Sequence, residues 1–143
     1  GQEIDAVRQW ILERLKQGTA PHEIGVFVRG DAQLERARAA LANLPAPFAI
    51  LDEKMAIQEG VISVGTMHLA KGLEFKAIVV MACDGDVVPL EERVENVGDE
   101  ADLEELYNTE RHLLYVACTR ARDELLLTGV KPVSEFLDDL RPR

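Results

Sequence analysis

The chain lacks several features that would assign it to a specialised class of protein. None of its apolar runs approaches the roughly 20 residues that a transmembrane helix needs, so we expect no membrane-spanning segment. The N-terminus lacks the basic and then apolar pattern of a signal peptide. Only two cysteines occur, Cys83 and Cys118, and both lie in apolar stretches without metal-ligand spacing. We therefore expect buried free thiols in a reducing compartment, and a cytoplasmic protein.

A basic excess, the usual footprint of a nucleic-acid-binding domain, is also absent. The formal net charge of the 143 residues is −10. Residues 84–105 hold ten acids and one base, which contributes −9, and the other 16 acids and 15 bases nearly balance. The protein is thus close to neutral apart from one acidic segment. Bulk charge gives no support to nucleic-acid binding, but it does not exclude a few aimed contacts.

The chain does contain a regular alternation of helical and extended patterns. Segments with apolar residues at spacings of three and four predict helices at residues 2–16, 34–44 and 102–120, with Asp31 as the N-cap of the second. Apolar β-rich runs predict strands at residues 24–28, 48–51, 61–64, 77–83 and 124–130. A surface loop is expected at residues 84–101 and a closing helix at 133–140. Strands that alternate with helices predict one α/β domain, residues 1–143, with a mainly parallel sheet.

The segment between two of the predicted strands concentrates polar groups suited to ligand binding. Residues 66–74 run T-M-H-L-A-K-G-L-E. Open α/β sheets bind ligands at the carboxyl ends of their strands, so we expect a functional loop there. The Lys71-Gly72 pair suggests phosphate binding, but the pattern G-x-x-x-x-G-K-[ST] occurs nowhere in the chain, which therefore has no complete triphosphate cradle of its own. The simpler alternative makes His68 a hydrogen-bonded histidine at a strand end and Glu74 a solvated carboxylate.

A second polar stretch covers residues 110–122 and reads E-R-H-L-L-Y-V-A-C-T-R-A-R. It places four basic or near-basic side chains on a predicted helix that also carries an apolar stripe: Arg111, His112, Arg120 and Arg122. Cations near a helix C-terminus are stabilised by the helix dipole, which is the ordinary explanation for the last two.

Together, the two polar stretches resemble the fifth and sixth motifs of the UvrD/Rep family of superfamily 1 DNA helicases. The order of the stretches, the apolar strand between them and the acidic loop are also similar to that family. Residues 27–33, F-V-R-G-D-A-Q, resemble a strand-to-helix junction of the same family. The resemblance covers about residues 24–129. It implies the C-terminal motor domain, a three-layer RecA-like fold that lacks the phosphate loop itself.

The resemblance further implies a composite ATP site. In the family, ATP with Mg²⁺ binds between two RecA-like domains, and the N-terminal one supplies the phosphate loop and the magnesium-binding acids. We therefore expect no metal ligands here, and an N-terminal RecA-like domain of the same parent chain as a partner. Arg120 matches the catalytic arginine that reaches the γ-phosphate, where a guanidinium can be worth roughly 10³ to 10⁵ in rate. Gly72 and Glu74 match positions near the nucleotide, and Lys71 is assigned to the phosphates or to holding the loop.

The other implied ligand is single-stranded DNA, which crosses both motor domains in the family. Thr66 and His68 match residues that touch the DNA backbone, and Arg29 is assigned to the same role. A hydroxyl and an imidazole suit contacts that are independent of sequence. The isolated 143 residues are predicted to be inactive, because the phosphate cradle is absent. Two alternatives stay open: a non-catalytic RecA-like module for protein interaction, with the acidic segment as its docking surface, and the helicase portion of a nuclease-helicase repair complex.

Overall fold

The computed structural model describes residues 2–54, 57–84, 87 and 98–129, and within these ranges the chain is built on a five-stranded sheet. The strands have the order β2-β3-β1-β4-β5, and every neighbouring pair is parallel. The strands are β1 (Ile24–Val28), β2 (Phe48–Ile50), β3 (Ile62–Thr66), β4 (Phe75–Val80) and β5 (Ala121–Leu127). The helices are α1 (Gln2–Lys16), α2 (Leu34–Leu41) and α4 (Glu100–Thr119), with short 3₁₀ turns η1 (Pro21–Glu23), η2 (Asp31–Gln33) and η3 (Met67–Ala70).

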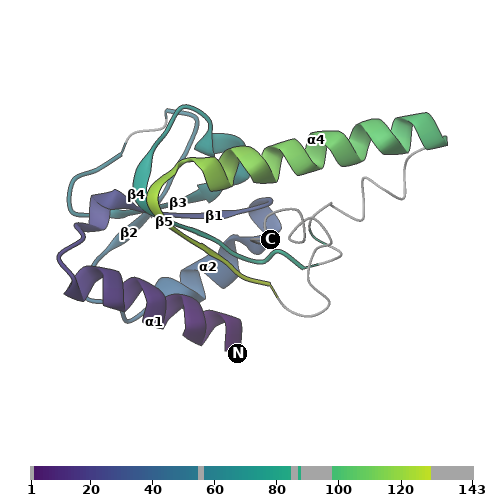
Figure 1. The fold of residues 1–143 in the computed structure, drawn as a ribbon. Helices are drawn as coiled ribbons and strands as arrows, with labels where there is room; N and C mark the ends of the chain where they lie inside the picture. Colours follow the sequence, from purple (N-terminus) through teal and green to yellow (C-terminus); the bar gives the residue numbers. More distant parts are fainter. Residues whose placement is uncertain (1, 55–56, 85–86, 88–97, 130–143) are drawn as a thin grey trace.

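The helices form one layer on each side of this sheet. Helices α1 and α2 cover one face and α4 covers the other (Figure 1). Successive side chains of a strand point to opposite faces, so Val26 and Val28 of β1 enter the α1–α2 core while Phe27 enters the α4 core. Strands buried on both faces read as continuous apolar runs, which is why β1 is buried at all five positions. The three-layer α/β arrangement expected from the sequence is confirmed.

Helix α1 and strand β1 have the bounds that the sequence predicts. In α1 the apolar stripe is recognisable because Val7 and Ile11 are fully buried. Trp10 flanks the stripe and lies under the guanidinium of Arg14, whose Cζ is 4.6 Å from the ring centroid. Local sequence patterns, periodicity for α1 and a continuous apolar run for β1, were sufficient for these two elements.

A polar cluster ties the start of α1 to the rest of this face. The carboxylate of Glu3 accepts hydrogen bonds from the backbone N–H of Ala82 (2.9 Å) and the hydroxyl of Thr128 (2.8 Å). It also forms an ion pair with Arg36 of α2, which donates through Nη1 (2.7 Å) and Nη2 (3.1 Å) to Asp84. The hydrogen bond to Asp84, followed by that to Glu3, raises the pKa of Arg36. The Glu3–Arg36–Asp84 cluster therefore joins both helices of this face to the ends of β4 and β5.

Helix α2 is shorter than the sequence predicts, and Asp31 is not its N-cap. The Oε1 atom of Gln33 accepts from the N–H of Gly30 (3.1 Å), and the η2 turn intervenes before α2 begins at Leu34. The helix ends at Leu41, and Asn43 adopts a positive φ of 68°. Leu44, predicted as part of the helical stripe, still packs against the core from outside the helix.

Other predicted boundaries near the C-terminus also need correction. Strand β5 begins three residues before the predicted position, and α4 begins at Glu100, inside the predicted loop of residues 84–101. Most of that loop, and the predicted helix at 133–140, lie outside the described residues. Cys83 and Cys118 are buried free thiols, as expected, and burial raises the pKa of Cys118 to about 12. In the described part of the chain, no helix combines the length and apolarity needed to cross a bilayer.

Candidate functional site

The polar segment after β3 crosses the sheet instead of forming a loop at one edge, which corrects the expectation from the sequence. Thr66 ends β3 beside Val28, at the carboxyl ends of the strands. Phe75 begins β4 beside Ala121, at the amino ends. Residues 67–74, which we name the crossing segment, therefore run from the carboxyl edge to the amino edge. Its Met67 is buried in the α4 core, so the crossing lies on the α4 face.

The crossing segment is held by one short helical turn and one glycine. Met67 and Ala70 of η3 are buried, and the N–H of Leu73 donates to the carbonyl of Ala70 (3.0 Å). Gly72 has a φ of +84°, which a residue with a side chain rarely adopts. No atom lies within 4 Å of where a Cβ would stand, so this backbone is open on that side. Gly72 therefore turns the chain and leaves room for a ligand to approach its backbone closely.

Arg120 lies at the amino edge, next to the end of the crossing segment. It follows directly after α4, and its carbonyl accepts from the N–H of Phe75 (3.0 Å). Its Nε is buried and has no hydrogen-bond partner among the described residues, while Nη2 makes a long bond to the hydroxyl of Thr119 (3.4 Å). Since Glu74 immediately precedes Phe75, the predicted catalytic arginine and the predicted nucleotide carboxylate belong to neighbouring strand starts.

The middle of the crossing segment faces α4 across a cavity of about 290 Å³. His68 and Lys71 line it from the crossing segment, and His112 lines it from α4. The remaining lining residues are Met67, Thr109, Glu110, Leu113 and Val116. The structure thus brings His68 and Lys71 together, although the family resemblance assigns His68 to DNA and Lys71 to the phosphates or to holding the loop. Thr66 lies apart from Glu74 and Arg120, at the opposite edge of the sheet.

The structure does not support Arg29 as a direct DNA contact. Its side chain is only 4% exposed, and it forms a bidentate ion pair with Glu110 of α4. A guanidinium whose fork already holds a buried carboxylate is not presented to a phosphate at the surface. Glu110, itself 1% exposed, is the residue that sequence reasoning missed. The one sign of its burial in the sequence is its spacing, which places it on the same side of α4 as the buried Leu106, Leu114 and Ala117.

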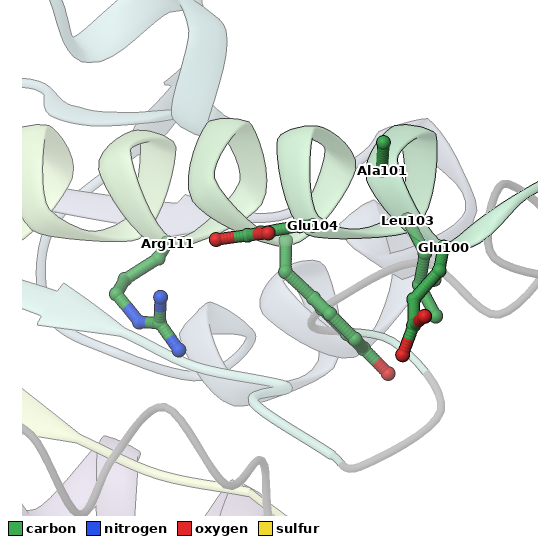
Figure 2. A pocket seen from close by; sticks show the side chains of 6 residues that line it. Glu100, Ala101, Leu103, Glu104 and Arg111 are labelled. Carbon is green, nitrogen blue, oxygen red and sulfur yellow. The ribbon is translucent and has the colours of Figure 1, made fainter.

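A second hollow lies along the N-terminal half of α4, which extends beyond the sheet (Figure 1). It has a volume of about 550 Å³, and Figure 2 shows Glu100, Glu104 and Arg111 along the flank of the helix that borders it. Ala101, Leu103 and Tyr107 complete the described lining. Its two glutamates would repel a phosphate, and none of the predicted site residues lines it. Within the described ranges, no three His, Cys, Asp or Glu side chains are grouped to hold a metal ion.

Comparison with known proteins points to one family. A model of the UvrD-like helicase C-terminal domain matches residues 31–131. The chain is 34% identical over 117 residues to the ATP-dependent DNA helicase UvrD1 of Mycobacterium leprae, which covers 72% of this chain and 14% of that protein. It is 40% identical over 83 residues to the ATP-dependent DNA helicase PcrA of Bacillus subtilis, which covers 57% of this chain and 10% of that protein. The chain thus spans a small fraction of these curated relatives.

One solved structure supports the fold independently. The chain is similar to the C-terminal domain of a possible DNA helicase from Lactobacillus plantarum WCFS1, with a TM-score of 0.67 and 24% identity. The match covers 97% of this chain and 73% of that one. It agrees with the RecA-like arrangement of a parallel sheet between two helical layers.

Proposed function

Because the chain belongs to the UvrD-like helicase C-terminal domain family, we propose that it serves as the second motor domain of an ATP-dependent DNA helicase. The observation that carries the proposal is the hydrogen bond between the carbonyl of Arg120 and the N–H of Phe75. This bond joins the end of α4 directly to the end of the crossing segment. The two stretches that resemble helicase motifs therefore meet at the amino edge of the sheet.

The amino edge has features that suit a nucleotide. The side chain of Arg120 is partly exposed, and among the described residues its guanidinium makes one long hydrogen bond, from Nη2 to Thr119, so its Nη groups keep donor capacity for an anion. The open backbone at Gly72 would let a phosphate approach closely. Arg120 would hold a planar fork against the γ-phosphoryl oxygens, a geometry that lysine does not offer. Bound ATP with Mg²⁺ would supply the phosphoanhydride bond whose cleavage drives the motor, and its phosphate cradle would come from the N-terminal RecA-like domain.

The other end of the crossing segment suits a strand of DNA. Thr66 is partly exposed at the carboxyl edge, and His68 is exposed on η3. Both side chains offer contacts to phosphate or to a base face that do not depend on sequence. Single-stranded DNA held there would lie about one strand length from Arg120, since β4 spans six residues at about 3.3 Å each. The crossing segment would then link DNA at one end to nucleotide at the other.

The proposal is tested by the ATP turnover of the full-length protein that contains this domain. We expect turnover to rise when single-stranded DNA is added, and to be undetectable in the isolated residues 1–143, whose folding is checked by circular dichroism. The isolated domain has no G-x-x-x-x-G-K-[ST] pattern to cradle the phosphates. Robust turnover by that domain, or full-length turnover that ignores DNA, would contradict the proposal.

A further inference from the structure

The most deeply buried ion pair in the described part of the chain joins the residue that follows β1 to α4. The Nε–H of Arg29 donates to Oε1 of Glu110 (2.9 Å), and Nη2 donates to Oε2 (2.6 Å). Both side chains are at least 96% buried, and 81 residues of sequence separate them. Two parallel hydrogen bonds from a planar fork fix both the distance and the rotation between the two groups.

The pair lies next to the carboxyl edge of the sheet, where DNA is proposed to bind. Arg29 follows Val28, which is aligned with Thr66 at the carboxyl edge of the sheet. Glu110 lines the cavity that His68 and Lys71 line from the crossing segment. The residue that anchors α4 is thus also part of the wall that faces the proposed DNA contact.

The same helix continues from this anchor to the nucleotide end. Ten residues separate Glu110 from Arg120, which corresponds to about 15 Å along α4. Leu114 and Ala117, which lie between them, are buried in the α4 core, so this length of helix is packed against the sheet. A small rotation of α4 at Glu110 would therefore be carried to Arg120 and to its bond with Phe75.

Stability alone does not account for such a pair. Taking both charges out of water costs free energy that their attraction only partly returns, and well-packed apolar residues are often as stable in the same place. What apolar residues do not reproduce is the fixed direction of two hydrogen bonds. The distinctive contribution of the pair is therefore the position of α4.

We propose that Arg29 and Glu110 are positioning residues that hold α4 so that DNA bound near Thr66 and His68 is coupled to Arg120. The inference rests on the proposed function. It assigns Arg29 a role in the response to DNA without a contact to DNA. Coupling between two sites of this kind typically corresponds to a 5-fold to 150-fold effect.

The test uses the full-length protein and the double variant Arg29→Met/Glu110→Leu, which removes both charges of the pair together. We expect its melting temperature to stay near that of the unmodified protein, while the ratio of DNA-stimulated to unstimulated ATP turnover falls about 5-fold or more. Arg29→Lys keeps the charge but loses the fork, so it should lower the same ratio by less. The KM for ATP should change little in both variants.

The matched control removes an exposed ion pair, Glu35→Gln/Arg38→Met on α2, and should leave the ratio unchanged. A normal ratio in the double variant overturns the inference. If the double variant does not fold, a normal ratio in Arg29→Lys overturns it instead. Failure of the proposed function looks different, because then the unmodified protein itself shows no stimulation by DNA.

Discussion

The two faces of the sheet are covered in different ways. On one face, α1 and α2 are seated on an apolar core, and the Glu3–Arg36–Asp84 cluster ties their polar groups together. On the other face the cover is one long helix and the crossing segment, whose only regular structure is the four-residue turn η3. That thinner cover leaves a cavity of about 290 Å³ with His68, Lys71 and His112 around it.

The difference between the two faces indicates where this chain can bind ligands. On the α1–α2 face, the polar side chains of Glu3, Arg36 and Asp84 pair with one another, so their role is to hold the fold. On the α4 face, His68 is exposed beside the cavity, and in the described part of the chain the guanidinium of Arg120 makes one long hydrogen bond, so both side chains retain capacity for an external partner. We therefore expect substitutions on the α1–α2 face to change the stability of the fold, and substitutions on the α4 face to change ATP turnover.

The largest expected effect is on the α4 face, at Arg120. In the full-length protein, Arg120→Ala should lower ATP turnover by about 10³-fold or more, because the developing charge on the γ-phosphoryl oxygens would lose its guanidinium. That loss corresponds to about 4 kcal/mol of barrier. Nucleotide affinity, measured by equilibrium binding, should change far less.

Arg122→Ala is the matched control for this prediction. Arg122 lies two residues further along, is about half exposed, and is paired with Glu23 at 3.7 Å. Its removal should leave turnover nearly unchanged. Equal turnover in Arg120→Ala and Arg122→Ala would show that Arg120 has no part in the reaction.

A smaller effect, and of a different kind, is expected on the opposite face. Arg36→Met should lower the free energy of unfolding by about 2 kcal/mol, since it removes charge-assisted hydrogen bonds to Glu3 and Asp84 that are partly screened by solvent. Chemical denaturation of the isolated domain measures this. An unchanged midpoint would mean that the cluster contributes nothing measurable to the fold.

The fold was predictable from the sequence wherever local patterns decide it. The bounds of α1 follow from apolar periodicity and those of β1 from a continuous apolar run, and both are confirmed. Strand β5 begins earlier than predicted because Phe75 pairs with Ala121 across the sheet, and this pairing outweighs the charged run Arg122-Asp123-Glu124. An edge strand can expose such residues, but a sequence window does not reveal which strand is at the edge.

The candidate site was predictable as a set of residues and not as an arrangement. The polar stretch at residues 66–74 was recognised, yet its passage from one edge of the sheet to the other follows from β3 and β4 both pairing parallel to β1, and no local pattern at residues 66–74 shows that pairing. The burial of Glu110 also depends on a partner 81 residues away. In sequence it stands in a polar run, E-R-H, that is typical of a solvated helix face.

The most direct test of the difference between the two faces is the ratio of ATP turnover with and without saturating single-stranded DNA, measured in full-length His68→Ala and Arg36→Met. We predict that His68→Ala lowers this ratio about tenfold, within the usual range for coupled sites, while Arg36→Met leaves it unchanged. A normal ratio in His68→Ala, or a reduced ratio in a folded Arg36→Met protein, would contradict the assignment of DNA coupling to the α4 face.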